Sequence, residues 1–491
     1  MMSSPLPRRM LVLVATMSTG LTTGASRAQD PLQGLPGFDD PPAGVASGGG
    51  LEGMGDPEGL DGLDGAGTAL RTADGLRVSA LRGFLASRGR FFPKDRRRGD
   101  GRLDGQWIQE LQLEFDLEIA DGLTGFFRPR FLIDAVDSDL VRTEPLEAYV
   151  TWSLGDHELR AGQLVENWGI ADTFNPIDVI NRRDIAEDPL DPVRLGELGV
   201  RWRWFLPEWL GGDAIGEPTL SFYALPVFRQ QLFPAERSRW SLAAPPAQLL
   251  EDQSVRPEDE NRLFFAVRAN STLNTAPANA DVQLLFSRGP ERFPQFAFSS
   301  PGGVPGGAVG LLPIYYGLTT VGGGLRAVPN FEALADYTIK AEVVYKMPFR
   351  FDGNPQTLAD DYLQYAFGVD RMFPNVLTDK DQITLTVEWV GETGAEDITA
   401  LYRPFDDDLV VRALWEANDF ERTSIEFRGF VDPNKNEWLL EGVYQQQLRM
   451  IHEDLQFEIG ARWFDVARSE PGFFQIFPDN SSVWVELRYD F

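Results

Sequence analysis

The sequence predicts an all-β fold, a transmembrane antiparallel up-and-down β-barrel of about 18 strands, and three observations lead to it. Segments of about ten residues in which apolar and polar side chains alternate recur after Arg77, as in membrane-spanning strands. The last segment, SSVWVELRYDF, alternates strictly and ends on Phe491. No stretch of the chain after the N-terminal apolar run approaches the roughly 20 apolar residues of a membrane-spanning helix. Because strand side chains alternate between two faces, these segments have one apolar and one polar wall, which suits a sheet that closes on itself.

The C-terminal segment resembles the C-terminal signal of Gram-negative outer-membrane β-barrels. In that signal, a final Phe preceded by alternating apolar residues is read by the barrel-assembly machinery. The residues that carry the resemblance share one face of the expected strand and are Val483, Val485, Leu487, Tyr489 and Phe491. The resemblance implies a porin-like barrel in the outer membrane, in contact with outer-membrane lipid, with Phe491 as its assembly signal.

Residues 1–28 have the order of features that is typical of a secretory signal peptide. Arg8 and Arg9 precede an apolar run from Met10 to Met17, and a stretch of small residues ends at Ala28. The run is too short to cross a bilayer as a helix. We therefore expect cleavage after Ala28 and export through the periplasm.

Residues 29–76 are rich in Gly, Pro and acids, as in GLEGMGDPEGLDGLDGAG. Such a composition cannot bury enough apolar surface to offset the conformational entropy of the chain, so we expect a disordered periplasmic tail. The tail is interpreted as a flexible linker or, as an alternative, as a docking segment for a periplasmic partner. Residues 77–491 are expected to form the barrel.

Charge and cysteine content exclude several classes of function. The formal net charge of −29 argues against binding of nucleic acid. The absence of cysteine fits a protein that passes an oxidising periplasm, and it rules out thiol catalysis and cysteine-based metal centres.

The expected hairpin around the Asp121-Gly122 turn shows how the wall of the lumen is built. On its first strand, even-numbered polar residues alternate with apolar ones that face lipid. The returning strand places arginines opposite this acidic row, which neutralises charge across the wall. The expected lumen-wall residues are Glu110, Glu114, Asp116, Glu118, Arg128 and Arg130.

Counting strands from both ends of the chain predicts one that is hidden. Counted forward from a periplasmic N-terminus, the last expected strand before this stretch runs outward; counted backward from an inward-running final strand, the first expected strand after it also runs outward. Neighbours in an up-and-down barrel run in opposite directions, so the stretch 288–332 must hold an inward strand, placed around Leu311 to Val321. The total is then 18, and 16 is the alternative. Either number encloses an aqueous lumen.

The loop expected at 166–197 carries the most motif-like residues of the chain. A loop of this length is usually functional or disordered, and its Trp, Phe and Ile residues argue against disorder. It resembles the constriction loop that folds into the lumen of general porins; the alternative is an extracellular cap. The candidate constriction residues are Trp168, Asp172, Asn175, Asp178, Arg182, Arg183 and Asp184.

Catalysis is poorly supported, and we expect no enzyme activity and no cofactor. The two histidines, His157 and His452, fall in expected periplasmic turns, far from a nucleophile or a carboxylate cluster. An acidic run at 405–408 is interpreted as a solvated loop rather than a metal site.

Two functions remain open. The first is a channel for small polar, neutral or cationic solutes, since the lumen wall leans acidic. The second is a non-conducting barrel that anchors or serves an export, lipid-handling or cell-surface assembly. An oligomer is possible in either case.

Overall fold

A computed structural model describes residues 77–93, 103–207, 214–242, 248–257, 262–299, 310–351, 360–394, 407–466, 477 and 480–491. The signal peptide expected at 1–28 and the tail expected at 29–76 lie outside the described residues. Among the described residues, no helix is long and apolar enough to cross a membrane.

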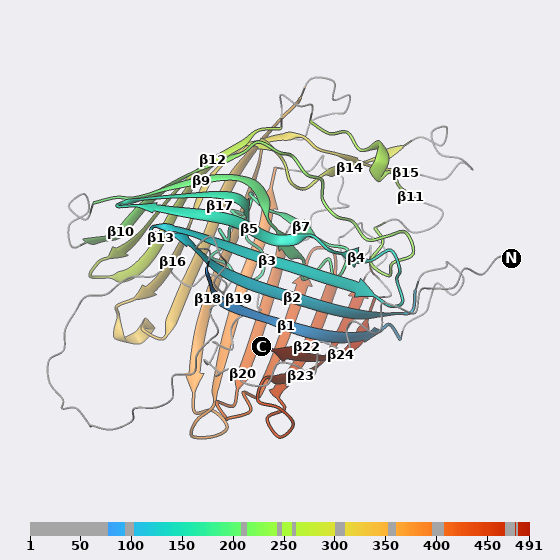
Figure 1. The fold of residues 1–491 in the computed structure, drawn as a ribbon. Helices are drawn as coiled ribbons and strands as arrows, with labels where there is room; N and C mark the ends of the chain where they lie inside the picture. Colours follow the sequence, from blue (N-terminus) through green and yellow to red (C-terminus); the bar gives the residue numbers. More distant parts are fainter. Residues whose placement is uncertain are drawn as a thin grey trace.

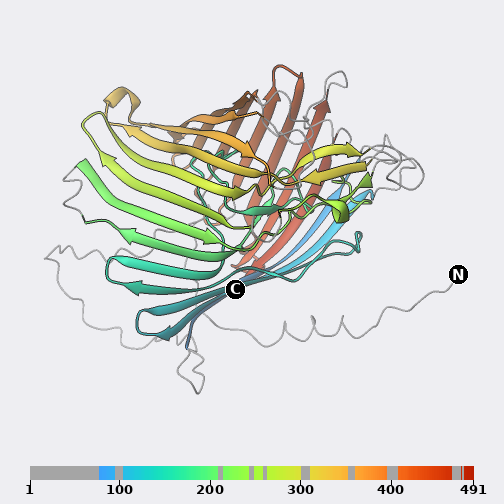
Figure 2. The same cartoon turned by 90° about the horizontal axis from the view of Figure 1, so that it is seen from above.

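Eighteen antiparallel strands form one closed wall, in which each strand pairs with its neighbours in the chain and β1 pairs with β24 (Figures 1 and 2). The predicted fold and strand number are thus confirmed. The barrel strands are β1 (Arg77–Phe91), β2 (Gly105–Ala120), β3 (Leu123–Asp134), β5 (Pro145–Leu154), β6 (His157–Leu164), β9 (Glu197–Phe205), β10 (Ile215–Leu225), β12 (Phe264–Asn274), β13 (Ala278–Pro290), β16 (Gly317–Pro329), β17 (Tyr337–Phe349), β18 (Tyr362–Pro374), β19 (Gln382–Thr393), β20 (Asp407–Glu416), β21 (Ser424–Asp432), β22 (Glu437–Gln447), β23 (Leu455–Val466) and β24 (Ser482–Asp490).

The last strand closes the barrel. β24 runs antiparallel to β1, with Phe91 opposite Val483 and Phe84 opposite Asp490. Beyond the strand, the N–H of Phe491 donates to the carbonyl of Gly83 at 2.9 Å, and the N–H of Gly83 donates back to the carbonyl of Phe491 at 2.9 Å. The terminal residue therefore belongs to the closing seam.

The outward face of the wall is apolar. On most strands the side chains of one parity are mainly apolar and reach the surface, as the exposed Trp107, Phe131, Trp389 and Trp463 illustrate, while the sequence neighbours of these four are buried on the inside. Exposed apolar surface over a whole closed sheet is stable in lipid and not in water. The barrel is accordingly a transmembrane barrel.

The hidden strand lies within the predicted stretch 288–332, but the predicted position, Leu311 to Val321, covers only its first five residues. The tenth barrel strand is β16, whereas residues 310–314 form β15 (Gly310–Ile314), which belongs to a separate sheet with β14 (Gln295–Ser299) and β11 (Gln248–Leu249). The apolar run of β15 imitates a barrel strand. The glycines 322–324 interrupt the side-chain alternation of β16 and conceal it.

The two ends of the barrel differ. Both ends of the barrel wall, the start of β1 and the end of β24, lie at the end with short turns, which in outer-membrane barrels is the periplasmic end. The other end, here the outer end, carries most of the long connections. These contain β4 (Val141–Arg142), β7 (Arg182–Asp184), β8 (Val193–Leu195), β11, β14, β15 and the short helix η3 (Glu251–Gln253); η5 (Glu332–Leu334) lies in a periplasmic turn.

Candidate functional site: a loop folded into the lumen

The connection between β6 and β9, residues 165–196, crosses the lumen and is held by the far wall. The carboxylate of Glu342 on β17 accepts hydrogen bonds from the backbone N–H groups of Ile170, Ala171 (2.8 Å) and Ile177 (3.4 Å). Glu342 is fully buried and faces inward, because its neighbours of the other parity face lipid.

A second wall carboxylate holds the next residues of the loop. Glu388 on β19 accepts the N–H groups of Asp172 at 2.7 Å and Thr173 at 2.9 Å. The ammonium of Lys340 pairs with Asp172 at 2.6 Å and with Asp370 of β18 at 2.6 Å. Seven strands lie between β6 and β19 along the wall of 18, so this part of the loop reaches the opposite side of the barrel.

The returning part of the loop is held by arginines of another sector of the wall. Glu187 pairs with Arg88 of β1 at 3.1 Å and with Arg130 of β3 at 2.7 Å. Asp188 pairs with Arg90 at 2.9 Å and with Arg462 of β23 at 2.9 Å. Apart from that of the half-buried Arg88, these are buried ion pairs, whose disruption leaves an uncompensated charge. The loop is thus fixed to at least five wall strands, β1, β3, β17, β19 and β23.

The wall also makes room for the tip of the loop. A Cβ on Gly324 of β16 would lie 2.7 Å from the Cδ1 of Ile170, so a larger residue there would require the Ile170 side chain to move. On the neighbouring strand, the side-chain amide of Gln283 donates to the carbonyl of Trp168 at 2.8 Å. The space at Gly324 and the hydrogen bond from Gln283 therefore place the tip of the loop at the same part of the wall.

Inside the loop, Asp178 joins two arginines. Its Oδ2 accepts from Arg183 at 2.9 Å and from Arg194 at 2.7 Å. Burial alone would raise the pKa of Asp178, but the two guanidinium groups outweigh it and hold the pKa below the ordinary value. The carboxylate is accordingly charged at neutral pH.

The predicted loop residues divide into two groups. Asp172, Asn175, Asp178 and Arg183 line a cavity between the loop and the wall. The other three contact neighbouring residues instead. Trp168 packs on Tyr223, with 5.0 Å between the ring centroids. Arg182 lies 3.5 Å from Glu197, and Asp184 pairs with Arg142 at 2.6 Å.

The cavity between the loop and the wall has a volume of about 260 Å³. Residues of β12, β13, β16, β17, β18, β19 and β21 line it opposite the loop. Its charged lining is balanced, with five bases and five acids: Arg183, Arg194, Arg292, Lys346 and Arg428, and Asp172, Asp178, Asp191, Glu291 and Glu392. Apolar side chains complete the lining, so the cavity presents both charged and apolar surface; they include Phe174, Phe264, Phe296 and Phe430.

The acidic row expected on β2 is paired with arginines on both neighbouring strands. Arg130 lies 2.5 Å from Glu110, and Arg128 lies 3.7 Å from Glu114. Toward the periplasmic end the partners come from β1. Arg82 pairs with Asp116 at 3.0 Å and Arg77 pairs with Glu118 at 3.5 Å, and these are the last two acids of the row. The sequence pattern indicated the β3 arginines but not those of β1.

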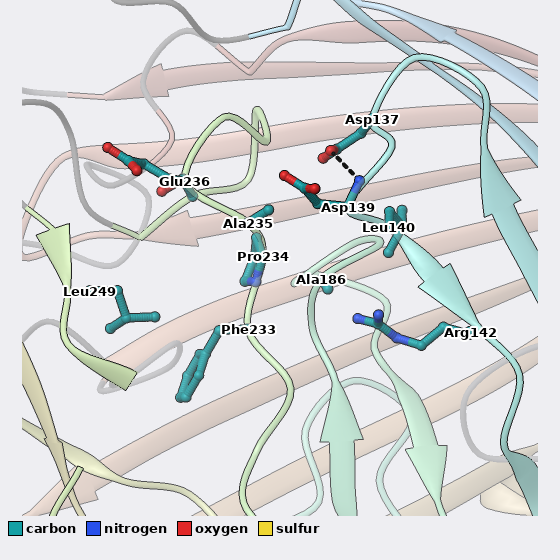
Figure 3. A pocket seen from close by; sticks show the side chains of 11 residues that line it. Asp137, Asp139, Leu140, Arg142, Ala186, Phe233, Pro234, Ala235, Glu236 and Leu249 are labelled. Atoms are coloured by element: carbon teal, nitrogen blue, oxygen red, sulfur yellow. Dashed lines mark hydrogen bonds between the residues drawn. The ribbon is translucent and has the colours of Figure 1, made fainter. Parts of the chain in front are cut away.

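A second pocket, of about 400 Å³, opens among the outer connections (Figure 3). Asp137, Asp139 and Glu236 supply its carboxylates, and Arg142 is its one cationic side chain. Burial raises the pKa of Asp137, although its Oδ1 accepts the N–H of Asp139 at 3.2 Å. The mouth of the barrel is therefore acidic on this side.

An apolar cluster at the outer end was not expected from the sequence. Inward-facing side chains near the outer ends of β20 to β23 pack against the outer connections, and Trp240 lies between Phe92 and Phe477 at 5.7 and 5.6 Å. The cluster fills this sector of the mouth. Its wall members are Val410, Phe430, Leu439 and Phe464. Alternation marks these positions as inward but does not say whether water or protein covers them.

Among the described residues, no group of three His, Cys, Asp or Glu side chains is placed to hold a metal ion. His157 packs on Trp202 and Trp204, with 5.7 and 5.9 Å between ring centroids. His452 packs on Tyr489 at 5.1 Å. Both histidines thus lie at the periplasmic end, away from the loop.

No protein-family model matches the chain, and no curated protein is similar to it. Solved structures with a similar fold include OccK11 (OpdR) of Pseudomonas aeruginosa. It shares 12% identity and has a TM-score of 0.45, and the match covers 84% of this chain and 95% of that chain. Another is Wzi of Escherichia coli, an outer-membrane protein involved in capsule assembly, with 11% identity, a TM-score of 0.47, and 84% of each chain covered. OccAB3 of Acinetobacter baumannii shares 10% identity, with a TM-score of 0.44, 84% of this chain and 100% of that chain covered.

The location of the protein follows from its own architecture. A closed antiparallel wall of 18 strands, an apolar outward face, and short turns at one end with long connections at the other are the features of barrels in Gram-negative outer membranes. The protein is an outer-membrane β-barrel.

Proposed function

We propose that the barrel is a channel for small polar solutes, neutral or cationic, and that the loop 165–196 is its constriction. The observation that carries the proposal is the seat of the loop: it is tied to opposite walls through Glu342 and Asp188 and leaves a charged cavity beside it. A pore needs such a restriction to select by size, and a polar lining to let water pass.

Charge supports neutral or cationic solutes over anions. The lumen wall pairs its acids with arginines, so it presents little net charge to a solute. The outer pocket, in contrast, holds three carboxylates and one arginine (Figure 3). A carboxylate-lined mouth raises the local concentration of cations and repels anions before they reach the constriction.

Current through the refolded mature protein in a planar bilayer tests this function. We expect a stable ohmic current, with a reversal potential in a salt gradient that indicates a weak preference for cations. The matched variant Asp139→Asn and Glu236→Gln, which removes two carboxylates of the outer pocket, is expected to lose much of that preference and to keep the current. An anion-selective wild-type current would contradict the proposed solute class.

The apolar cluster at the outer mouth favours a second candidate, a non-conducting barrel that anchors or serves a cell-surface, export or lipid-handling assembly. Trp240, Phe464 and Phe477 fill part of the mouth, as they would in a plug. In this case the segment 29–76 is the candidate for binding a periplasmic partner. Absence of any current from barrels that are folded in the bilayer would favour this function, and capture of a defined periplasmic protein by the 29–76 peptide would support it.

A further inference from the structure

Four turns at the periplasmic end differ from the others in length. Each joins a pair of strands in the C-terminal half of the barrel and has seven residues, whereas the fully described turns that join β2 to β3, β5 to β6 and β12 to β13 have two or three. The four turns are 330–336, 375–381, 417–423 and 448–454. Because their hairpins are neighbours in the wall, the turns form one continuous arc, here called the turn arc.

The turn arc carries the most exposed large apolar side chains of the described chain. Met450 is 100% exposed, Phe420 82%, Ile451 73% and Leu377 71%. Single apolar residues on a surface are ordinary, but several on adjacent turns indicate a surface with a partner. The short turns of the other half are built of polar and small residues such as Asp121 and Gly122.

The turns present these side chains on a fixed backbone. The carboxylate of Asp381 accepts the N–H groups of Leu377 at 2.9 Å and Thr378 at 3.0 Å, and the indole N–H of Trp415 at 2.8 Å. In the next turn, Asp419 accepts the N–H of Thr423 at 2.8 Å. The acids that hold the turns are thus engaged with the backbone, and the apolar tips are held outward.

We propose that the turn arc is immersed in the headgroup layer of the periplasmic leaflet and that its partner is lipid. The outward face of β20 is apolar from Leu409 to Trp415, and Asp407, which accepts the indole N–H of Trp389, lies at its outer end. Seven residues at a rise of about 3.4 Å and a tilt of about 40° give a height of about 18 Å, less than the apolar band of about 25 Å. Measured from Asp407, the band therefore extends past Trp415 to the turn 417–423.

Contacts at the closing seam make the turn arc continuous with the lipid-facing band. Tyr489 and the half-exposed Phe491 belong to the outward face at the periplasmic end, with 6.2 Å between their ring centroids. The ring of His452, in the last turn of the arc, packs on Tyr489 at 5.1 Å. Met450 and Ile451 stand directly before His452 in the chain, so they continue the lipid-facing band at its periplasmic edge.

The turns carry charges of both signs beside their apolar tips. Three of the turns place one cation within three residues of an apolar tip: Lys380 beside Leu377, Arg422 beside Phe420, and Arg449 beside Met450. Each of these turns also holds two acids, of which Asp381 and Asp419 are engaged with backbone N–H groups. An apolar side chain in the acyl boundary with a cation at the level of the phosphates is the arrangement that interfacial segments use.

The absence of cysteine from the chain allows a direct test with single labels. The variants Phe420→Cys and Met450→Cys, each labelled with an environment-sensitive fluorophore, are folded into vesicles of phosphatidylethanolamine and phosphatidylglycerol. We expect lipids brominated in the acyl chain to remove most of the emission at both positions, and iodide in the buffer to remove little. The control is Asp121→Cys, on a two-residue turn, where iodide is expected to remove most of the emission.

Quenching of positions 420 and 450 by iodide and not by brominated lipid would overturn the proposal, and is the result for a surface that waits for a periplasmic protein. Equal quenching by brominated lipid at position 121 would also overturn it, because the label rather than the turn would then set the depth. Migration of each variant as a heat-modifiable folded barrel shows that the labels report the native protein.

Discussion

The carboxylate of Glu342 on β17 accepts the backbone N–H of Ala171 at 2.8 Å, across the lumen from the strand on which the loop begins. The two residues are 171 positions apart in the chain. Together with the bonds from Ile170 and Ile177, this contact determines where the loop lies. A wall side chain thereby defines the width of the proposed pore.

Removal of the charge from both wall carboxylates, in Glu342→Gln with Glu388→Gln, is expected to loosen the tip of the loop. A charged acceptor contributes about 1.5–3 kcal/mol per hydrogen bond, more than a neutral amide does. Hydrogen exchange of the amides at 170–173 should rise strongly, with the barrel strands unchanged. The control Glu426→Gln changes a wall glutamate that pairs with Arg412 and not with the loop, and it should leave these amides protected. Unchanged exchange in the double variant would contradict the role of the two carboxylates.

Substitution of Asp188→Asn should destabilise the folded barrel. The change removes the carboxylate from the buried guanidinium group of Arg90 and leaves Arg462 with Glu441 alone, at a cost of about 3–5 kcal/mol. Guanidinium titration in lipid vesicles, followed by tryptophan fluorescence, measures the free energy of unfolding. The exposed acid of the outer pocket gives the control Asp139→Asn, which should change stability little. Equal stability of the two variants would show that the arginines find other partners.

Acid should release the same part of the loop. Burial alone would raise the pKa of Asp188, but Arg462 and Arg90 outweigh it and hold the pKa well below the ordinary value. A depressed pKa means that this group stabilises the fold fully above its unfolded value of about 3.9 and progressively less as the pH falls below it. The free energy of unfolding of the wild type should therefore fall between about pH 5 and pH 2, and fall less in Asp188→Asn. A parallel decline in both proteins would assign the acid sensitivity to other groups.

Selectivity is expected to change near neutral pH through Glu291, which lines the cavity beside the loop. Burial raises the pKa of Glu291 to about 7, opposed by Lys346 and increased by Glu392. The carboxyl is therefore mostly neutral below pH 7 and charged above it. Cation preference, measured as a reversal potential, should be greater at pH 8 than at pH 6, and Glu291→Gln should abolish the difference. The same preference at both pH values in the wild type would contradict this assignment.

The sequence predicts the wall of the barrel well because the wall follows a local rule. Alternation with a period of two identifies the lipid-facing positions, such as Trp389 and Trp463, and the strand count follows from the parity of the two ends. The rule fails at β16, where three glycines, 322–324, remove the side chains that would reveal it.

The site is predicted less completely because its contacts are far apart in the chain. Alternation marks Glu342, Glu388 and Arg462 as inward-facing, but nothing local indicates that they hold residues of one loop. For the same reason Phe464 and Val410 could not be recognised as members of an outer cluster. Composition identified the loop as ordered, and only the fold shows what orders it.

The most direct test of the central claim is the single-channel conductance of the refolded protein compared with that of a variant lacking residues 167–195. Both proteins must first migrate as folded, heat-modifiable barrels. If the loop constricts a conducting pore, the wild type gives a small stable current and the deletion gives a larger one, since the same wall then encloses an unobstructed lumen. No current from either folded protein, or equal currents from both, would contradict the account.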